Sequence, residues 1–249
     1  MKHARIAMAL VAAAGTLLAA RVAQADCTDP SCPKEVSQAM QASALRRPFV
    51  FSFAVRSLSY LPSAHDRFDG HVQSSPMGYQ FSGDELGDST IRTFGAELGA
   101  DYALTPLFYV GAAAAWGEGA WSATPFAAGN MTLQPRGTVD THMWLTGARA
   151  GARLPLGPVS VRAELLAGAQ WMEVDQLAQP ATGSQTMTGS ARTVTWLLEP
   201  RAAVDLWTTP YLVVSAFGTM PGFESRAANG GLLFAWHWRS FDGRYSGVL

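Results

Sequence analysis

Eight segments of the chain alternate between apolar and polar residues. They span residues 49–60, 91–104, 107–121, 141–154, 159–174, 192–206, 211–220 and 231–241. In the fifth segment Val161, Leu165 and Trp171 fall on one face, and Arg162 and Glu164 fall on the other. Successive side chains of a β-strand point to opposite faces, whereas an amphipathic helix would space its apolar residues near 3.6 positions. The pattern therefore predicts eight β-strands and an all-β fold.

The connections between these segments alternate between short turns and long loops. The short turns fall at residues 104–107, 155–158 and 207–210, and the long loops span residues 62–90, 122–140, 175–191 and 221–230. The loops are rich in Gly, Ser, Thr, Pro, Asn and Gln, which favour irregular backbone. Short turns on one side and long loops on the other are typical of bacterial outer-membrane barrels. The sequence predicts an eight-stranded antiparallel transmembrane up-and-down β-barrel over residues 49–241.

Aromatic residues in the apolar phase indicate which face of the barrel points outward. They gather near the two ends of the strands, and the predicted set is Tyr102, Trp116, Trp144, Trp171, Trp196 and Trp207. Two aromatic bands of this kind mark the two membrane–water interfaces of a barrel whose apolar face contacts lipid. The alternative is a soluble lipocalin-like carrier, in which the apolar face would line an internal cavity.

The polar phase carries nearly balanced charges. With lipid outside, the lumen would hold Arg56, Arg149, Arg153, Arg162, Arg201 and Arg239 against Glu97, Asp101, Glu164, Glu199 and Asp205. Leaving one buried charge unpaired costs about 3–5 kcal/mol, so these groups should form ion pairs. We expect a salt-bridge network that fills a narrow barrel. A gate or an ion path is the alternative function for the same residues.

Turn lengths suggest specific partners for two of the lumen arginines. If Leu154 pairs with Val159 across residues 155–158, Arg149 faces Glu164 directly. The same reasoning at the third turn places Arg201 opposite Ser215.

The first residues have the organisation of a secretory signal. Lys2 and Arg5 precede an apolar run over residues 6–20, and Ala23-Gln24-Ala25 supplies a small-x-small cleavage site. We therefore expect cleavage of residues 1–25, a periplasmic N-terminal segment over residues 26–48, and a C-terminal tail over residues 242–249. Cys27 and Cys32 would form a local disulfide after export to an oxidising compartment.

Charge excludes nucleic acid as a partner. The formal charge of the whole chain is −1. Removing the signal with its three basic residues, Lys2, Arg5 and Arg21, leaves −4, without the basic surplus that nucleic-acid binding requires.

The organisation described above resembles that of the OmpA-like and OmpX-like small barrels of bacterial outer membranes, over about residues 49–241. The closing segment is the nearest feature to a motif, since Leu232, Phe234, Trp236 and Trp238 alternate as the last strand of that family does. Phe241 departs from the pattern because it is out of phase. The resemblance implies a bacterial outer-membrane location and membrane lipids as partners.

The candidate chemistry is sparse. The histidines beyond the signal are His65, His71, His142 and His237, and none has an evident nucleophile and orienting acid at the required spacing. We therefore predict no enzyme activity, cofactor or metal. The acidic loop over residues 62–90 is the first candidate for binding an extracellular ligand. The predicted role is structural or surface interaction; the alternatives are a small pore or hydrophobic-molecule transporter, a lipid A-modifying barrel enzyme, and the lipocalin-like carrier.

Overall fold

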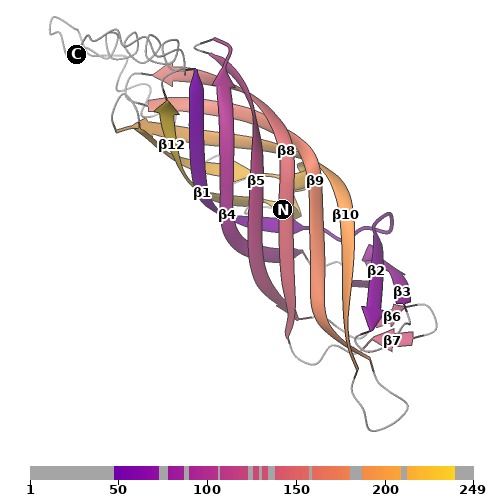
Figure 1. Ribbon diagram of the computed structural model, residues 1–249. Coiled ribbons are helices and arrows are strands. Elements are labelled where there is room, and N and C mark those ends of the chain that lie inside the picture. Colours follow the sequence, from indigo (N-terminus) through magenta and orange to yellow (C-terminus); the bar gives the residue numbers. More distant parts are fainter. Residues whose placement is uncertain are drawn as a thin grey trace, which may run out of the picture.

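Eight long antiparallel strands form a closed ring (Figure 1). The computed structural model describes residues 48–72, 78–86, 90–105, 107–122, 126–128, 131–133, 138–156, 159–179, 187–208 and 212–238. The ring consists of β1 (Phe49–Tyr60), β4 (Ile91–Ala103), β5 (Phe108–Ser122), β8 (Thr138–Leu156), β9 (Val159–Gln179), β10 (Met187–Trp207), β11 (Leu212–Thr219) and β12 (Asn229–Trp238). Pairing of β12 with β1 and of β10 with β11 closes it. The predicted eight-stranded antiparallel barrel is confirmed.

Several sequence predictions concern residues outside those described. They are the signal over residues 1–25, nearly all of the segment over residues 26–48, the Cys27–Cys32 disulfide, Arg239 and the tail over residues 242–249. In the part of the chain that is described, no helix is long and apolar enough to cross a membrane.

Strand register fixes the tilt of the barrel. Following paired residues once around the ring from Trp196 leads back to β10 at Leu206, ten residues further along. For eight strands, this offset corresponds to a tilt of about 40° from the barrel axis. Each residue of a tilted strand then rises about 2.5 Å along the axis.

The wall of the barrel is tall on one side and short on the other. β8, β9 and β10 have 19, 21 and 21 residues, whereas β11 and β12 have 8 and 10. The tall strands continue into segments predicted as loops, so the assignment of residues 122–140 and 175–191 as loops is wrong at their edges. The turn after β11 contains two short 3₁₀ turns, η2 (Pro221–Phe223) and η3 (Ser225–Ala227).

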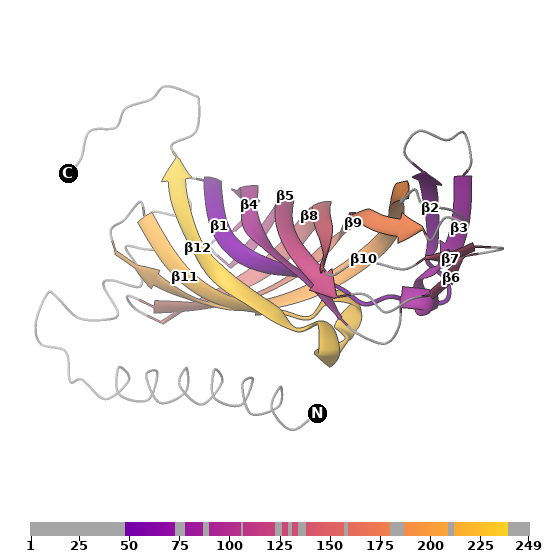
Figure 2. The ribbon, with the colours of Figure 1, turned by 90° about the horizontal axis from the view of Figure 1, so that it is seen from below.

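The predicted loop over residues 62–90 also contains regular structure. It forms a hairpin of β2 (Arg67–Val72) and β3 (Gly78–Ser82), followed by the 3₁₀ turn η1 (Gly83–Leu86). β2 pairs with the part of β10 that extends beyond β11, as Figure 2 shows at the right-hand end of the molecule. Because β11 ends early, this hairpin satisfies backbone groups of β10 that would otherwise be unpaired. A second small hairpin, β6 (Phe126–Ala128) and β7 (Met131–Leu133), lies nearby.

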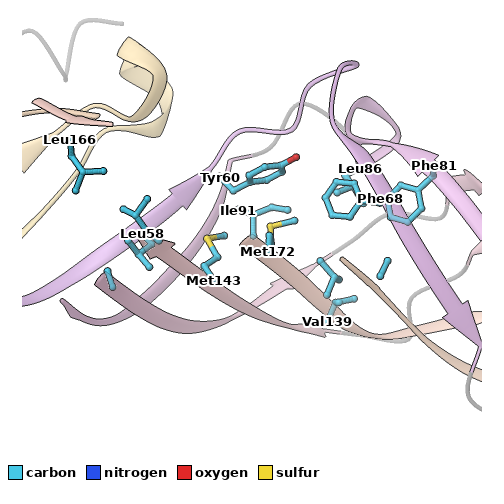
Figure 3. Packing of buried hydrophobic residues seen from close by; sticks show 14 of the residues in the cluster. Leu58, Tyr60, Phe68, Phe81, Leu86, Ile91, Val139, Met143, Leu166 and Met172 are labelled. Atoms are coloured by element: carbon cyan, nitrogen blue, oxygen red, sulfur yellow. The ribbon is translucent and has the colours of Figure 1, made fainter. Parts of the chain in front are cut away.

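The β2–β3 hairpin contributes to an apolar cluster at the long-loop end of the barrel interior, which we call the loop-side cluster (Figure 3). Its buried members are Leu58, Tyr60, Phe68, Tyr79, Phe81, Leu86, Ile91, Ala113, Ala115, Val139, Met143, Leu145, Leu166, Met172, Val174 and Ala191. A second cluster, the turn-side cluster, contains Val50, Ala54, Ala203, Trp207, Val213, Phe217, Leu233 and Ala235.

Asp66 holds the start of the hairpin against β1. Its carboxylate accepts hydrogen bonds from the Tyr60 hydroxyl at 2.6 Å and from the Ser63 backbone N–H at 3.0 Å. Its backbone carbonyl accepts a hydrogen bond from Gly83 at 2.9 Å. The hairpin is therefore anchored at both of its ends.

Candidate functional site

Glu97 is the centre of the charged layer inside the barrel. Its carboxylate lies 2.6 Å from a nitrogen of Arg56, and it accepts two hydrogen bonds from Arg201 at 2.7 and 2.8 Å. A nitrogen of Arg149 lies 3.4 Å away. Arg56 continues to Glu199 at 2.9 Å. All five side chains are buried, so each charge is compensated where water is scarce.

A second group of contacts surrounds Asp101. Arg149 donates two hydrogen bonds to its carboxylate, at 2.6 and 2.8 Å, and a third to Ser52 at 3.0 Å. Paired guanidinium donors match the two oxygens of a carboxylate, which makes this contact strong and directional. Gly99 leaves the necessary space, since a Cβ atom there would collide with the Arg149 guanidinium.

Asp205 and Glu164 complete the layer. Asp205 accepts hydrogen bonds from Arg162 at 3.0 Å, Ser160 at 3.1 Å and Ser215 at 2.6 Å, and Arg153 approaches it to 3.6 Å.

Glu164 links this group to the first. It lies 2.9 Å from Arg201 and 3.4 Å from Arg162, and it accepts a hydrogen bond from Tyr109 at 2.6 Å. Among the described residues, five arginines therefore face five carboxylates inside the barrel.

Two predicted registers are wrong. Leu154 pairs with Val161 instead of Val159, because β8 continues through Leu156 and leaves only a two-residue connection. Arg149 therefore lies opposite Leu166, and it reaches Asp101 on β4 in place of Glu164.

At the third turn, Arg201 lies opposite Thr219, and Asp205 takes the position opposite Ser215. The cause is a wider turn, in which the Thr208 N–H donates to the Leu212 carbonyl.

Trp207 is a further correction. It was predicted in the outer aromatic band, yet its side chain points into the barrel with 8% of its surface exposed. Its indole N–H donates to Ser160 at 3.2 Å, and its ring lies 4.8 Å from that of His237 and 5.4 Å from the Arg153 guanidinium. The physical reason is phase, since outward residues of β10 such as Leu206 are even-numbered.

The outer face carries exposed apolar residues at two heights. We call a line at constant height around the barrel a level contour. Because the register is offset by ten residues over eight strands, a level contour moves about one and a quarter residues away from the paired residue at each successive strand. Trp196, Trp171 and Trp144 lie close to one such contour, and Trp116 pairs directly with Trp144. Tyr102, Phe108, Leu154, Leu206 and Trp236 lie close to the other.

Ten residues of β10 separate the two contours, which corresponds to about 25 Å along the barrel axis. That is the height of the apolar band on outer-membrane barrels.

Beyond the tryptophans the outward face becomes polar. His142 lies between Glu118 at 3.5 Å and Asp175 at 3.6 Å, and its ring stacks on Trp144 at 6.0 Å. The change from tryptophan to charged residues marks the edge of the apolar band.

A pocket of about 300 Å³ opens on the same outer face, where β2, β10 and β9 meet. It is lined by Asp69, Gly70, His71, Glu173, Ser190, Ala191 and Arg192. The register between β9 and β10 shifts at this point, where Asp175 and Gln176 form a bulge of β9 opposite the single residue Ser190 of β10. Bulges redirect side chains and are frequent beside functional sites.

The Tyr79 ring packs behind the pocket, where a Cβ on Gly70 would collide with it, and its hydroxyl donates to the Ser190 carbonyl at 3.2 Å. Burial raises the pKa of Tyr79 to about 12, so this donor keeps its proton at neutral pH.

Ser190 and His71 bring a hydroxyl and an imidazole together at this pocket. The Ser190 oxygen lies 3.5 Å from Nδ1 and 3.4 Å from Nε2 of His71. A hydroxyl nearly equidistant from both nitrogens is not aligned with the in-plane lone pair of either. Among the described residues, no group of three or more potential ligands could hold a metal ion.

Sequence reasoning did not bring the pocket residues together. Asp69 and His71 lie within the predicted acidic loop over residues 62–90, and the sequence predictions assign no role to Glu173 or Arg192. One signal was present: Glu173 continues the outward phase of Trp171 on β9, and Arg192 continues that of Trp196 on β10. Charges that follow tryptophans in the outward phase indicate the start of the polar interface.

Comparisons with known proteins give similarity in fold alone. No protein-family model matches the chain, and no curated protein matches it. Among solved structures, it is similar to the attachment invasion locus protein Ail of Yersinia pestis in complex with the heparin analogue sucrose octasulfate, with 13% identity, 75% of this chain and 97% of that chain covered, and a TM-score of 0.36.

Two further structures are similar to the same degree. Neisserial surface protein A shares 10% identity over 76% of this chain and 97% of that chain, with a TM-score of 0.43. The outer membrane protein OprG of Pseudomonas aeruginosa shares 11% identity over 78% and 92%, with a TM-score of 0.37. The predicted resemblance to small outer-membrane barrels is confirmed by the chain's own closed ring of eight antiparallel strands. The closed eight-stranded ring and its apolar band of about 25 Å are those of a bacterial outer-membrane barrel.

Proposed function

We propose that the protein is a non-enzymatic outer-membrane barrel with a plugged lumen, which acts as a structural element or in surface interactions through its long-loop end. The observation that carries this proposal is the compensated charge layer around Glu97, which packs beside the turn-side cluster, since the Phe217 ring lies against Arg56 and Arg201. Eight strands leave an interior that side chains just fill. An ion crossing it would have to break buried ion pairs and pass the buried apolar side chains of the loop-side cluster.

The long-loop end is the part of the molecule suited to interaction. The tall strands β8, β9 and β10 carry the β2–β3 hairpin beyond the apolar band, and this hairpin is anchored through Asp66 and the loop-side cluster. A rigid support with exposed polar residues such as Asp69 and His71 is the usual basis of loop-mediated recognition. An extracellular ligand would therefore contact the segment over residues 62–90.

Conductance and folding measurements test this proposal together. The full mature chain is folded into lipid vesicles, and an electrophoretic shift between unheated and boiled samples establishes the closed barrel. The folded protein is then added to planar bilayers. We expect a heat-dependent shift and no discrete conductance steps. Steps in the folded protein would establish a small pore, and release of acyl chains from lipid A by the folded protein would establish an enzyme.

A further inference from the structure

A row of outward polar side chains crosses the tall wall on the long-loop side of the apolar band. Its members are directly opposed on neighbouring strands, in the order Glu118, His142, Glu173, Arg192, Asp69 and Gln80. Both ends of the row are paired within the protein, since His142 lies 3.5 Å from Glu118 and Gln80 donates to Oδ1 of Asp69 at 2.7 Å. The middle is open, because neither Glu173 nor Arg192 has a hydrogen bond or an ion pair with a described residue. The pocket lies at this open middle.

The height of the pocket restricts the direction from which a ligand can enter. Glu173 lies two residues beyond Trp171, and Arg192 lies four residues beyond Trp196 on the same outward face. At about 2.5 Å per residue, they stand about 5 and 10 Å outside the edge of the apolar band. The polar headgroup layer of a bilayer is about 5–8 Å deep on each side, so the Arg192 side of the pocket lies beyond it. The pocket therefore opens to water on the long-loop side.

The charges of the lining disfavour a simple ion. Two carboxylates, of Asp69 and Glu173, against the guanidinium of Arg192 leave a formal charge of −1 with His71 neutral. An anion would be repelled by both carboxylates, and a cation would be repelled by Arg192, which lies between them. A neutral ligand avoids both costs. It must donate and accept hydrogen bonds within a short distance, because acceptors and donors alternate along the row, and hydroxyl groups do both.

The size of the pocket suits a small cyclic polyol. Its volume of about 300 Å³ equals that of about ten water molecules in the liquid, and a hexose has a similar number of non-hydrogen atoms. Neighbouring strands lie about 4.8 Å apart, a distance that one sugar ring can span. Ser190 and His71 add a hydroxyl and an imidazole to the lining, and Gly70 and Ala191 leave a small apolar surface for the C–H groups of a sugar.

We propose that this pocket binds one neutral sugar unit of a glycan that approaches from the aqueous side. Arg192 donates to its oxygens, and Glu173 accepts from its hydroxyl groups. Asp69 has a smaller part, because Gln80 already occupies one of its oxygens. The inference rests on the proposed role in surface interactions and deepens it, since it assigns a class of ligand to the β2–β3 hairpin.

A glycan array tests the assignment. The full mature chain is folded into lipid nanodiscs and applied to an array that carries neutral, carboxylated and sulfated glycans. We expect binding to neutral glycans, and weaker binding to the acidic ones because of the negative lining. Arg192→Ala and Glu173→Ala should each lower binding about tenfold, the effect of losing one charged hydrogen bond.

Matched substitutions elsewhere on the outer face are the controls. Arg92→Ala and Glu118→Ala remove exposed outward charges from β4 and β5 and should leave binding unchanged. Absence of binding to neutral glycans, or equal losses in the control and pocket variants, would overturn the assignment. Nanodiscs that contain a neutral glycolipid form a separate arm, and retention of this lipid without binding to the array would overturn the aqueous source.

A change of charge tests why neutral sugars are preferred. Asp69→Asn together with Glu173→Gln removes both carboxylates and changes the formal charge of the lining from −1 to +1. The double variant should bind sulfated glycans better than the natural protein does, and neutral glycans less well. Unchanged selectivity would show that the lining does not select the ligand.

The gel shift and the conductance of the same samples separate the two proposals. Folded, non-conducting protein without glycan binding contradicts the sugar assignment alone. Conductance steps contradict the plugged lumen, and protein that does not fold into nanodiscs contradicts the membrane placement.

Discussion

Two arginines of β10 show how differently the inner and outer faces of this barrel use charge. Arg201 faces inward and contacts Glu97, Glu164 and Glu199. Arg192, nine residues earlier and in the opposite phase, lies between two carboxylates without an ion contact to any described residue. Inside, water is scarce and an unpaired charge is costly, so the protein supplies every partner itself. Outside, solvent can supply the partner, so the exposed Arg192 needs no ion contact within the protein.

The largest expected effect comes from removing the centre of the inner layer. Glu97→Gln leaves Arg56, Arg149 and Arg201 with one negative charge fewer, and it should lower the free energy of unfolding by about 3–5 kcal/mol. Urea titration of the gel shift in vesicles measures the change. Glu118→Gln, on the exposed outer face, should change stability by no more than about 0.5 kcal/mol. Similar losses in the two variants would show that the faces do not differ in this way.

A double-mutant cycle examines one inner pair. Asp101→Asn and Arg149→Met each leave the other charge buried, whereas the double variant removes both. We expect a coupling free energy of about 1–3 kcal/mol between the two positions. Additive losses would mean that the two-pronged contact between Arg149 and Asp101 contributes no net coupling. The same denaturation assay gives all four values.

Two tryptophans of β10 extend the comparison to apolar residues. Trp207→Phe removes the hydrogen bond to Ser160 inside the barrel, at a cost of about 1 kcal/mol. Trp196→Phe should cost less, because 88% of Trp196 is exposed on the outer face.

Quenching by brominated lipids tests the two positions directly. It should fall in Trp196→Phe and stay unchanged in Trp207→Phe. The opposite result would return Trp207 to the outer aromatic band.

The smallest expected effect on stability belongs to the pocket. Arg192→Gln should change the free energy of unfolding by no more than about 0.5 kcal/mol, because no ion contact with a described residue is lost. The measurement is the urea titration used for Glu97→Gln. A loss as large as that of an inner arginine would mean that Arg192 is structural and that the two faces do not differ in this way.

The periodicity of the sequence predicts much of the barrel, and the features that it does not predict have physical causes. Arg162 and Trp171 fall on the expected faces because alternation alone determines the face. The register between neighbouring strands is not determined by this alternation alone. A slip of one residue would reverse every side chain, whereas the observed slip of two between Leu154 and Val161 leaves every face unchanged. The pattern therefore could not distinguish Glu164 from Asp101 as the partner of Arg149.

The β2–β3 hairpin escaped prediction for another reason. Its polar composition is that of a loop, although Phe68 and Gly70 alternate with Asp69 and His71, and Tyr79 and Phe81 alternate with Gln80. The hairpin forms because β10 offers it an unpaired edge, and that depends on the early end of β11. Information so distant along the chain does not appear in a local pattern.

Unequal strand lengths have a consequence for the protein's neighbours in the membrane plane. A molecule that diffuses laterally toward β11 and β12 meets a wall that ends near η2, with Phe223 exposed at its rim. One that arrives from the opposite side meets β8, β9 and β10, which continue outward and carry the hairpin. The barrel is therefore asymmetric in the plane of the bilayer, and its encounters with other membrane components depend on the direction of approach.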